Sequence, residues 1–300
     1  MEESKLSAFL STTTEKIFGA KLNYRLRYLH QRGHFPNLKN PNDLSEILLS
    51  QLTDDESCKY YAPYIDKVLM RDYVKEKGLE RILLKHYGVW DTPEEIPFDE
   101  LPEQFVLKSN NGCGNHVICY EKAQLDRAKA IHTLHNAIEY GLHGVEPHYH
   151  HIIPKVYAEE LIETPDKLMP TDYKFTCVGG EIMDVFVATE RSTSTKYCTL
   201  DLNWSTLPYT KGEYMPKAIP AKPSLLNEMA KIAKVLCADF DFVRVDLYEY
   251  HNQVYISELT FFPWGALLYS YTDEAIRLYG QKWHESHNKK KPLNETTTTR

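Results

Sequence analysis

Lys108 stands directly before a run of small and polar residues, Ser109-Asn-Asn-Gly-Cys-Gly-Asn115. Exposed backbone N–H groups beside a lysine suit the oxygens of phosphate groups. Apolar and polar residues alternate on both sides of the run, so we predict a hairpin whose mobile, glycine-rich tip covers phosphates. Asn111-Gly112 is also a strong turn signal by itself, and an ordinary hairpin without a ligand is the alternative.

The glycine run does not match the commonest nucleotide-binding motifs. Gly112-x-Gly114 lacks the third glycine of the dinucleotide fingerprint, and a strand pattern follows it where that fold needs a helix. The sequence contains no G-x-x-x-x-G-K-[ST] loop, and it lacks the H-R-D and D-F-G motifs of protein kinases. A glycine-rich hairpin that folds over phosphates remains.

Two carboxylates are expected on one face of a second predicted hairpin, residues 244–260. If residues 251–253 form a three-residue loop, Asp246 lies opposite Glu258 on one face. Opposed like charges destabilise a strand pair, so something should compensate. One candidate is Mg²⁺, which is held by one or two carboxylates and completed by phosphate oxygens and water. The other is Arg244, two residues from Asp246 on the same face.

The elements that must position these residues alternate between helical and strand patterns, which indicates an α+β or α/β enzyme. Asn42 or Asp43 is expected to cap a helix that runs to Leu52, and Ser224 to cap another. Gly78 and Gly141 are expected to end helices. Further helices are predicted over 65–78, 122–141 and 224–240 and from residue 273. Single strands are predicted over 156–163, 242–250 and 254–262, and two strands around a Gly-Gly turn over 172–190.

Composition bounds the function further. A chain of 300 residues with 42% hydrophobic content can bury a large core, and its net charge of −7 disfavours a general nucleic-acid-binding role. No apolar run reaches the length of a membrane span, and the start, Met-Glu-Glu-Ser-Lys, does not resemble a signal peptide. We therefore expect a cytoplasmic protein. The six cysteines form no C-x-x-C motif and suggest neither a zinc site nor disulfides.

An ordered set of motifs resembles the ATP-grasp superfamily, and more closely its teichuronopeptide-biosynthesis-like branch, which is linked to cell-surface polysaccharide synthesis. The motifs lie between residues 60 and 283 and are YIDKVLMRDYV, FVLKSNNGCGNHV, YAEELIE, TDYKFTCVGGEI, ATERSTSTKY, NW and VRVDLYEYHNQVYISELTFFPWGA. The resemblance implies an α+β fold in which two subdomains enclose a nucleotide cleft. The implied divisions are a helical region at 1–60, subdomains at 61–155 and 156–283, and a disordered tail at 284–300.

The resemblance also implies roles for matching positions. Phosphates would be approached by Lys67 and Lys108 and covered by Ser109, Asn110, Gly112 and Gly114. The adenine hinge would be Glu159, Glu160, Leu161 and Ile162, with Lys174 near ribose or phosphate. Mg²⁺ would be bound by Asp246 and Glu258. Arg191 and Arg244 would contact the transferred phosphate or an acidic substrate. Thr260 stands where many ATP-grasp enzymes carry an asparagine, and Lys174 where several carry an acidic residue.

The implied activity is an ATP- and Mg²⁺-dependent carboxylate–amine ligase. ATP would phosphorylate a carboxylate on a uronic acid or a related sugar precursor, and an amine from an amino acid or amino sugar would attack the acyl phosphate. The alternatives are a glycosyltransferase that uses a nucleotide sugar, although the only D-x-D match is Asp239-Phe-Asp241, and a binding scaffold without catalysis.

Two further stretches, one rich in histidine and one rich in aromatic residues, each have two possible roles. His143, His148, His150 and His151 lie close together, but no further ligand spacing completes a zinc site, and a surface loop with substrate contacts is the expectation. The stretch FFPWGALLYSY, residues 261–271, is either ordinary core or a stacking wall for a sugar ring.

Overall fold

The computed structural model describes residues 19, 21–112, 114–143, 146–162, 170–189 and 195–290, without the side chains of residues 289 and 290. Its helices are a helix over residues 21–32, α2 (Leu44–Leu52), α3 (Asp55–Ile65), α4 (Met70–Glu76), α5 (Arg127–His143), α6 (Leu226–Cys237) and α7 (Asp273–Lys290). Its strands are β1 (His86–Trp90), β2 (Phe105–Ser109), β3 (Val117–Cys119), β4 (Val156–Glu159), β5 (Asp172–Val178), β6 (Glu181–Thr189), β7 (Lys196–Leu200), β8 (Phe242–Tyr250) and β9 (Gln253–Thr260).

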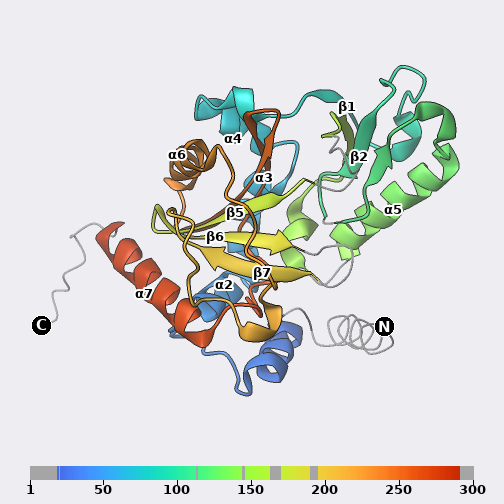
Figure 1. The fold of residues 1–300 in the computed structure, drawn as a ribbon. Coiled ribbons are helices and arrows are strands. Elements are labelled where there is room, and N and C mark those ends of the chain that lie inside the picture. Colours follow the sequence, from blue (N-terminus) through green and yellow to red (C-terminus); the bar gives the residue numbers. More distant parts are fainter. Residues whose placement is uncertain are drawn as a thin grey trace, which may run out of the picture.

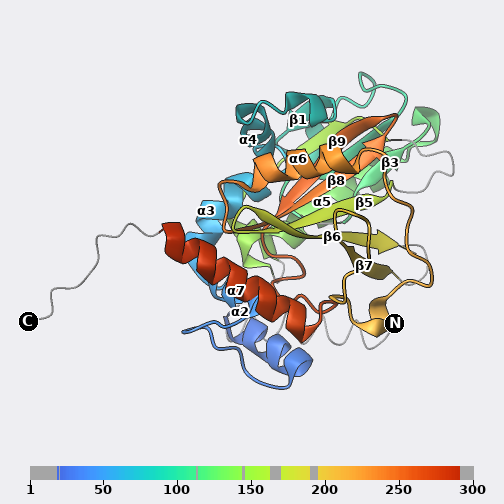
Figure 2. The same ribbon diagram turned by 60° about the vertical axis from the view of Figure 1, so that its left-hand side comes forward.

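The strands form two antiparallel sheets. The smaller has the order β1-β4-β2-β3 and packs against α5, and the larger has the order β7-β6-β5-β8-β9 (Figure 1). Helix α6 lies on one side of the larger sheet, and α2 and α7 lie together on the other side (Figure 2). The α+β prediction is therefore confirmed.

The structure corrects the expected boundaries. Strand β4 pairs with β1 and β2, so a division between residues 155 and 156 falls inside the smaller sheet. The described residues between 19 and 60 do not form a separate region, because α3 crosses that limit and Tyr28 and Leu49 share a hydrophobic core with Val245 of the larger sheet. Helix α7 continues to Lys290, so residues 284–290 of the expected tail are helical; residues 291–300 lie outside the described part.

Local signals for helix ends were right in part. Asp43 caps α2 as predicted, accepting a 2.9 Å hydrogen bond from the backbone N–H of Glu46. Ser224 does not cap α6, because its hydroxyl donates instead to the carboxylate of Glu249, and the helix begins at Leu226. The helix expected from residue 65 begins only at Met70, after a turn.

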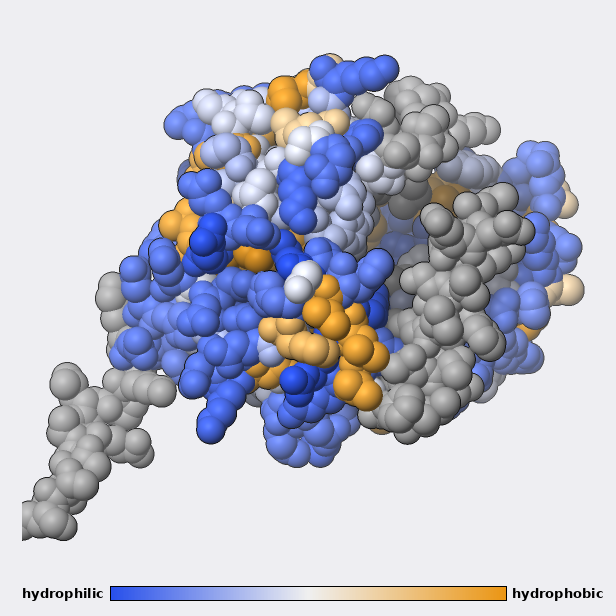
Figure 3. Space-filling model, turned by 90° about the horizontal axis from the view of Figure 1, so that it is seen from below, coloured by the Kyte–Doolittle hydropathy of each residue, from blue (hydrophilic) through white to orange (hydrophobic). Residues whose placement is uncertain are grey.

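On the face seen from below Figure 1, the described residues form no broad apolar area (Figure 3). Among the residues coloured in Figure 3, hydrophilic ones cover most of this face and hydrophobic ones gather in small separate groups, unlike the continuous patch that marks a large docking site. Within the described ranges, none of the helices combines the length and apolar composition that a bilayer span requires.

Candidate active site

The glycine-rich hairpin is formed as predicted, with Val106 of β2 opposite Ile118 of β3. The first half of its tip is fixed, however. Asn110 is fully buried; its amide donates to Asp66 at 2.8 Å and to the carbonyl of Ile153 at 3.0 Å. The backbone of Asn110 is bonded as well, since its N–H donates to the carbonyl of Lys155 at 3.0 Å and its carbonyl accepts from the N–H of Lys67 at 3.4 Å. These bonds contradict the expected mobile tip at this position.

Helix α5 packs closely against the same tip. Gly141 was expected to end this helix, but it lies inside it, and a Cβ atom there would meet the backbone oxygen of Asn111 at 1.9 Å. The glycine is therefore required by close packing and not by a helix stop. Gly112 also packs on α5, where a Cβ would lie 3.3 Å from the carbonyl oxygen of Ala137. Gly114 has a φ of +69°, which favours glycine.

Asp246 and Glu258 lie opposite each other in β8 and β9, as predicted, but the predicted loop is wrong. The turn has two residues, His251 and Asn252, with φ of 47° and 58°, and Tyr250 pairs with Gln253. Positive φ at both central residues is typical of the two-residue hairpin turn that matches strand twist. A bulge between the pairs Leu247–Ile256 and Asp246–Glu258 adds the missing residue, Ser257.

The bulge solves a conflict between the two faces of β9. Val254 and Ile256, which precede the bulge in the sequence, are buried, and so is Leu259, which follows it. Burial in strict alternation would place Glu258 on the same face as Ile256. The extra residue at 257 inverts the alternation, so the apolar residues stay inside while Glu258 faces Asp246. The spacing V-x-I-x-x-L carries this signal in the sequence.

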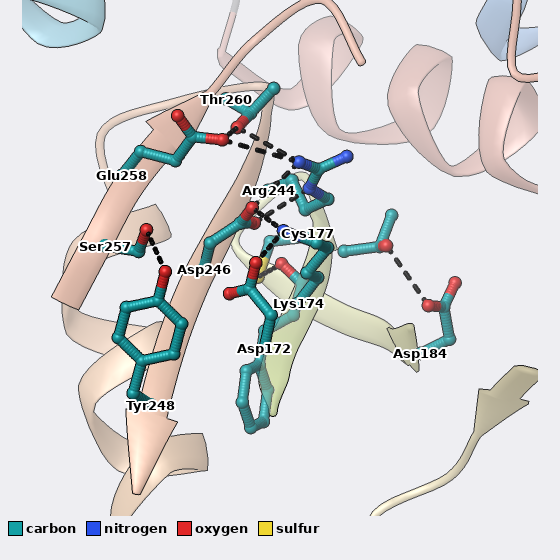
Figure 4. Close-up of polar contacts among 12 residues, drawn as sticks. Asp172, Lys174, Cys177, Asp184, Arg244, Asp246, Tyr248, Ser257, Glu258 and Thr260 are labelled. Atoms are coloured by element: carbon teal, nitrogen blue, oxygen red, sulfur yellow. Dashed lines mark hydrogen bonds and ion pairs between the residues drawn. The ribbon is translucent and has the colours of Figure 1, made fainter. Parts of the chain in front are cut away.

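Asp246 is the centre of a buried ion-pair network (Figure 4). Arg244 donates from Nε and Nη2 to its two carboxylate oxygens, each at 2.8 Å. The Lys174 ammonium pairs with Asp246 as well, and with Asp172 at 2.6 Å. Glu258 lies at the rim of this network, 3.8 Å from Arg244, with 29% of its side chain exposed.

The network keeps its members charged. Burial alone would raise the pKa of Asp246, but Arg244 and Lys174 lower it below the usual range. Burial opposes the charge on Lys174, but Asp172 and Asp246 raise its pKa. Arg244 is therefore the compensating partner of Asp246, the alternative to a metal ion considered above.

At this site one carboxylate, that of Glu258, could bind Mg²⁺, rather than the two expected. Both oxygens of Asp246 are occupied by cationic side chains, whereas Glu258 is partly exposed. Across the described ranges there is no group of three or more His, Cys, Asp or Glu residues that could hold a metal ion. A single carboxylate together with substrate phosphates is nevertheless a common Mg²⁺ environment. Glu258 is thus the residue that would hold the ion.

Two cavities lie along the same face of β8. The main cavity, of about 600 Å³, is lined by Arg244 and Glu258, together with Lys67 and Lys174. The small pocket, of about 40 Å³, includes Tyr248. Its wall also contains Lys108 and the predicted hinge residues Glu159, Glu160, Leu161 and Ile162.

Many of the predicted site residues therefore lie at two neighbouring places, whereas Ser109, Asn110, Gly112, Gly114 and Asp246 line neither cavity. In the main cavity, Lys67 donates to the carbonyl of Gly112 at 2.5 Å and lies 3.9 Å from Glu258. In the small pocket, Lys108 is ion-paired with Glu159. Arg191 lies outside the described residues.

Several lining residues of the main cavity were missed. They are Tyr24 and Arg27 of the helix over 21–32, and Tyr140 and Glu146 near the end of α5. Isolated polar residues on a helix carry no local signal, so only the tertiary structure reveals them. His148 also lines this cavity; it belongs to a 3-10 helix, Pro147–His151, and is buried rather than on a surface loop. Burial, and then Lys67, lower the pKa of His148 to about 3, so it is neutral.

The aromatic stretch 261–271 contributes to the core, as one of the two alternatives predicted, and also to the wall of the main cavity; stacking on a sugar ring stays a prediction. Phe261 and Phe262 belong to the hydrophobic core, where Phe261 stacks on Tyr61 at a centroid distance of 4.5 Å. Trp264 is half-buried and lines the main cavity, 5.6 Å from the guanidinium of Arg244.

Comparison with known proteins gives one family match. A family model described as TupA-like ATPgrasp matches residues 46–283. None of the curated proteins matches the chain.

Among solved structures, the D-alanine–D-alanine ligase from Helicobacter pylori is 18% identical, with a TM-score of 0.43 over 74% of this chain and 61% of the ligase. The corresponding ligase from Bacillus anthracis is 15% identical, with a TM-score of 0.44 over 76% and 69%. The L-amino acid ligase from Bacillus licheniformis is 12% identical, with a TM-score of 0.39 over 65% and 42%. The chain thus spans less than two thirds of the first of these relatives.

Proposed function

Because the chain belongs to the TupA-like ATPgrasp family, we propose that it is an ATP- and Mg²⁺-dependent ligase that joins a carboxylic acid to an amine. ATP phosphorylates the carboxylate and leaves as ADP; the amine then attacks the acyl phosphate, forming the C–N bond while phosphate departs with the electrons of the C–O bond. We propose a uronic acid or a related acidic sugar as the acid.

The observation that carries this proposal is the alignment of the two cavities on β8. Tyr248 faces the small pocket and Arg244 the main cavity, with the buried Asp246 between them. A nucleotide with its base in the small pocket would direct its phosphates toward the cationic groups of the main cavity. Lys67, Lys174 and Arg244 supply positive charge there, and charge neutralisation and positioning dominate phosphoryl transfer.

The chain's own groups have separable tasks in this proposal. Arg244 is held by Asp246 in one orientation, so its remaining N–H groups can bind the acid or the transferred phosphate without reorganising. Lys67, tied to the carbonyl of Gly112, holds the glycine-rich tip beside the phosphates. Glu258 would hold Mg²⁺, which neutralises phosphate charge. Trp264, which is half-buried at the cavity wall, would contact a substrate that carries a sugar ring, because aromatic side chains pack on such rings.

Binding of nucleotides to the purified chain tests the proposal. Calorimetric titration with a non-hydrolysable ATP analogue and Mg²⁺ should give saturable binding, whereas UDP-glucose should not bind. ADP release is then measured with galacturonate and glucuronate in the presence of amines. Binding of UDP-glucose without binding of the ATP analogue would favour the glycosyltransferase alternative and reject the ligase.

Lys108→Met should weaken binding of the ATP analogue by at least about tenfold, because a charge-assisted hydrogen bond is worth about 1.5–3 kcal/mol. The fold should also lose some stability, because Glu159, the partner of Lys108, is only 10% exposed and would be left without this cation, so urea unfolding is measured beside the titration. Lys234→Met is the matched control, because Lys234 also pairs with a glutamate, Glu181, but lies on α6 away from both cavities. Equal affinities of the two variants in the titration would remove Lys108 from the nucleotide site.

A further inference from the structure

Asp246 is separated from the main cavity by the two cations that bind it. Its side chain is fully buried and lines neither cavity, whereas Lys174 and Arg244 both line the main one. Two hydrogen bonds from Arg244 and one from Lys174 occupy most of the roughly four acceptor sites of the carboxylate. A ligand that enters the cavity on this side therefore meets an ammonium and a guanidinium instead of a carboxylate.

The backbone register places Lys174 at this point. The lysine lies on β5 directly opposite Asp246 of β8, and Asp172, two residues earlier on the same face, contacts the same ammonium at 2.6 Å (Figure 4). An ammonium has three donors, so among the described contacts these two carboxylates leave one N–H for a group in the cavity. The two carboxylates also hold the ammonium in one position, because only 12% of the lysine side chain is exposed.

Glu258, the other carboxylate of this strand pair, can be reached from the main cavity. It lines the cavity, and the cations nearest to it, Lys67 and Arg244, lie 3.9 and 3.8 Å away, farther than a hydrogen bond. The Thr260 hydroxyl donates to its Oε1 atom at 3.2 Å, which leaves acceptor sites on the carboxylate for an ion. At Asp246 a divalent ion would instead have to displace a buried ammonium, and breaking a buried ion pair is costly.

We propose that the protein uses one divalent ion, held by Glu258, and that the Lys174 ammonium takes the place of a second ion at Asp246 and binds a phosphate oxygen of ATP. The inference rests on the ligase function proposed above and concerns how its nucleotide site neutralises charge. In many sites of phosphoryl transfer two divalent ions share the phosphate charge. A lysine binds phosphate as a point charge, so Lys174 can supply the second cation without any coordination by Asp246 to a metal.

A count of bound Mn²⁺ on the full chain tests this inference. Mn²⁺ replaces Mg²⁺ as the probe and is measured by electron paramagnetic resonance with the non-hydrolysable ATP analogue, the protein being in excess over the analogue. The original chain should bind one Mn²⁺ per bound nucleotide. Lys174→Ala should bind two, because Asp172 and Asp246, freed from the ammonium they share, become a pair of carboxylates that suits a divalent ion. Lys174→Arg keeps a cation at this place and should bind one.

The affinity for the ATP analogue gives a second readout. In Lys174→Ala it should fall by about tenfold at limiting Mn²⁺ and recover as Mn²⁺ is raised, because the second ion then replaces the lost cation. A lysine with a purely structural task would not show this recovery. Lys234→Met is the control, since Lys234 pairs with Glu181 away from both cavities, and this variant should match the original chain in count and affinity.

Two Mn²⁺ per nucleotide on the original chain, or one on folded Lys174→Ala, would overturn the inference. If Lys174→Ala does not fold, the counts on the original chain and on Lys174→Arg decide, with one ion expected on each. A second ion on the original chain would leave the ligase proposal standing, because the nucleotide is still bound. Failure of the original chain to bind the ATP analogue would reject that proposal separately.

Discussion

Asp246→Asn is expected to lower the free energy of unfolding of the ligand-free protein by about 3 kcal/mol or more, because it strands two buried cations. The two oxygens of Asp246 bind Arg244 and Lys174, and its side chain is fully buried. From the sequence alone the expectation depends on the partner: a metal site predicts a ligand-free protein that is unchanged or slightly stabilised, and a network with Arg244 predicts a destabilised one. The bonds from Arg244 to Asp246 favour the second outcome. Activity should also be lost, since Arg244 and Lys174 would no longer be held.

Glu258→Gln tests the proposed metal site separately from the buried ion pairs of Asp246. Glu258 is partly exposed and lies 3.8–3.9 Å from its nearest cations, Arg244 and Lys67, so its neutralisation should change stability by no more than about 0.5 kcal/mol. It should nevertheless abolish Mg²⁺-dependent ATP turnover. Urea unfolding and ADP release are measured on both variants. A stable Asp246→Asn protein would refute the buried network, and full turnover in Glu258→Gln would refute its metal role.

Gly141→Ala is expected to weaken binding of the ATP analogue strongly and to lower stability by about 1–3 kcal/mol, the usual cost of overpacking. In an open helix the same change would stabilise by up to about 1 kcal/mol. Here the new methyl group would lie 1.9 Å from the backbone oxygen of Asn111, so the glycine-rich tip or α5 must move. Calorimetric titration and urea unfolding measure the two effects.

Gly280→Ala provides a matched control for overpacking. Gly280 also lies inside a helix, α7, and a Cβ there would meet the Cα of Asp43 at 2.7 Å, far from the tip in the sequence and the fold. This variant should lose stability but keep its affinity for the ATP analogue. Equal loss of affinity in both variants would show that general destabilisation, and not displacement of the tip, explains the result.

The sequence predicted the α+β fold class, both hairpins and the family, and the family match confirms that resemblance. These features follow from local alternation, from turn residues and from the order of motifs. The Gly179-Gly180 turn between β5 and β6, with φ of 59° and 77°, was equally readable. Such signals lie within a few neighbouring residues.

What the sequence did not predict depends on contacts between distant segments. Gly141 has the local appearance of a helix stop, and only the approach of Asn111 explains it. Arg27 and Glu146 line one cavity although they lie far apart in the sequence. The assignment of Asp246 to a metal ignored Lys174, because the pairing of β5 with β8 that brings it there is not encoded in the hairpin itself.

The bulge at Ser257 has a consequence for how this hairpin could tolerate a change in length. Deleting Ser257 would leave Ile256 opposite Leu247 and Glu258 opposite Asp246, with every side chain on its present face. The Ser257 hydroxyl would lose its 2.9 Å contact with Tyr248 in the small pocket. Deletion of Tyr255 instead would move the side chains of the preceding residues to the opposite face of β9 and so expose Val254. Ser257 is thus a position where natural insertions and deletions can be absorbed while the two carboxylates stay opposed.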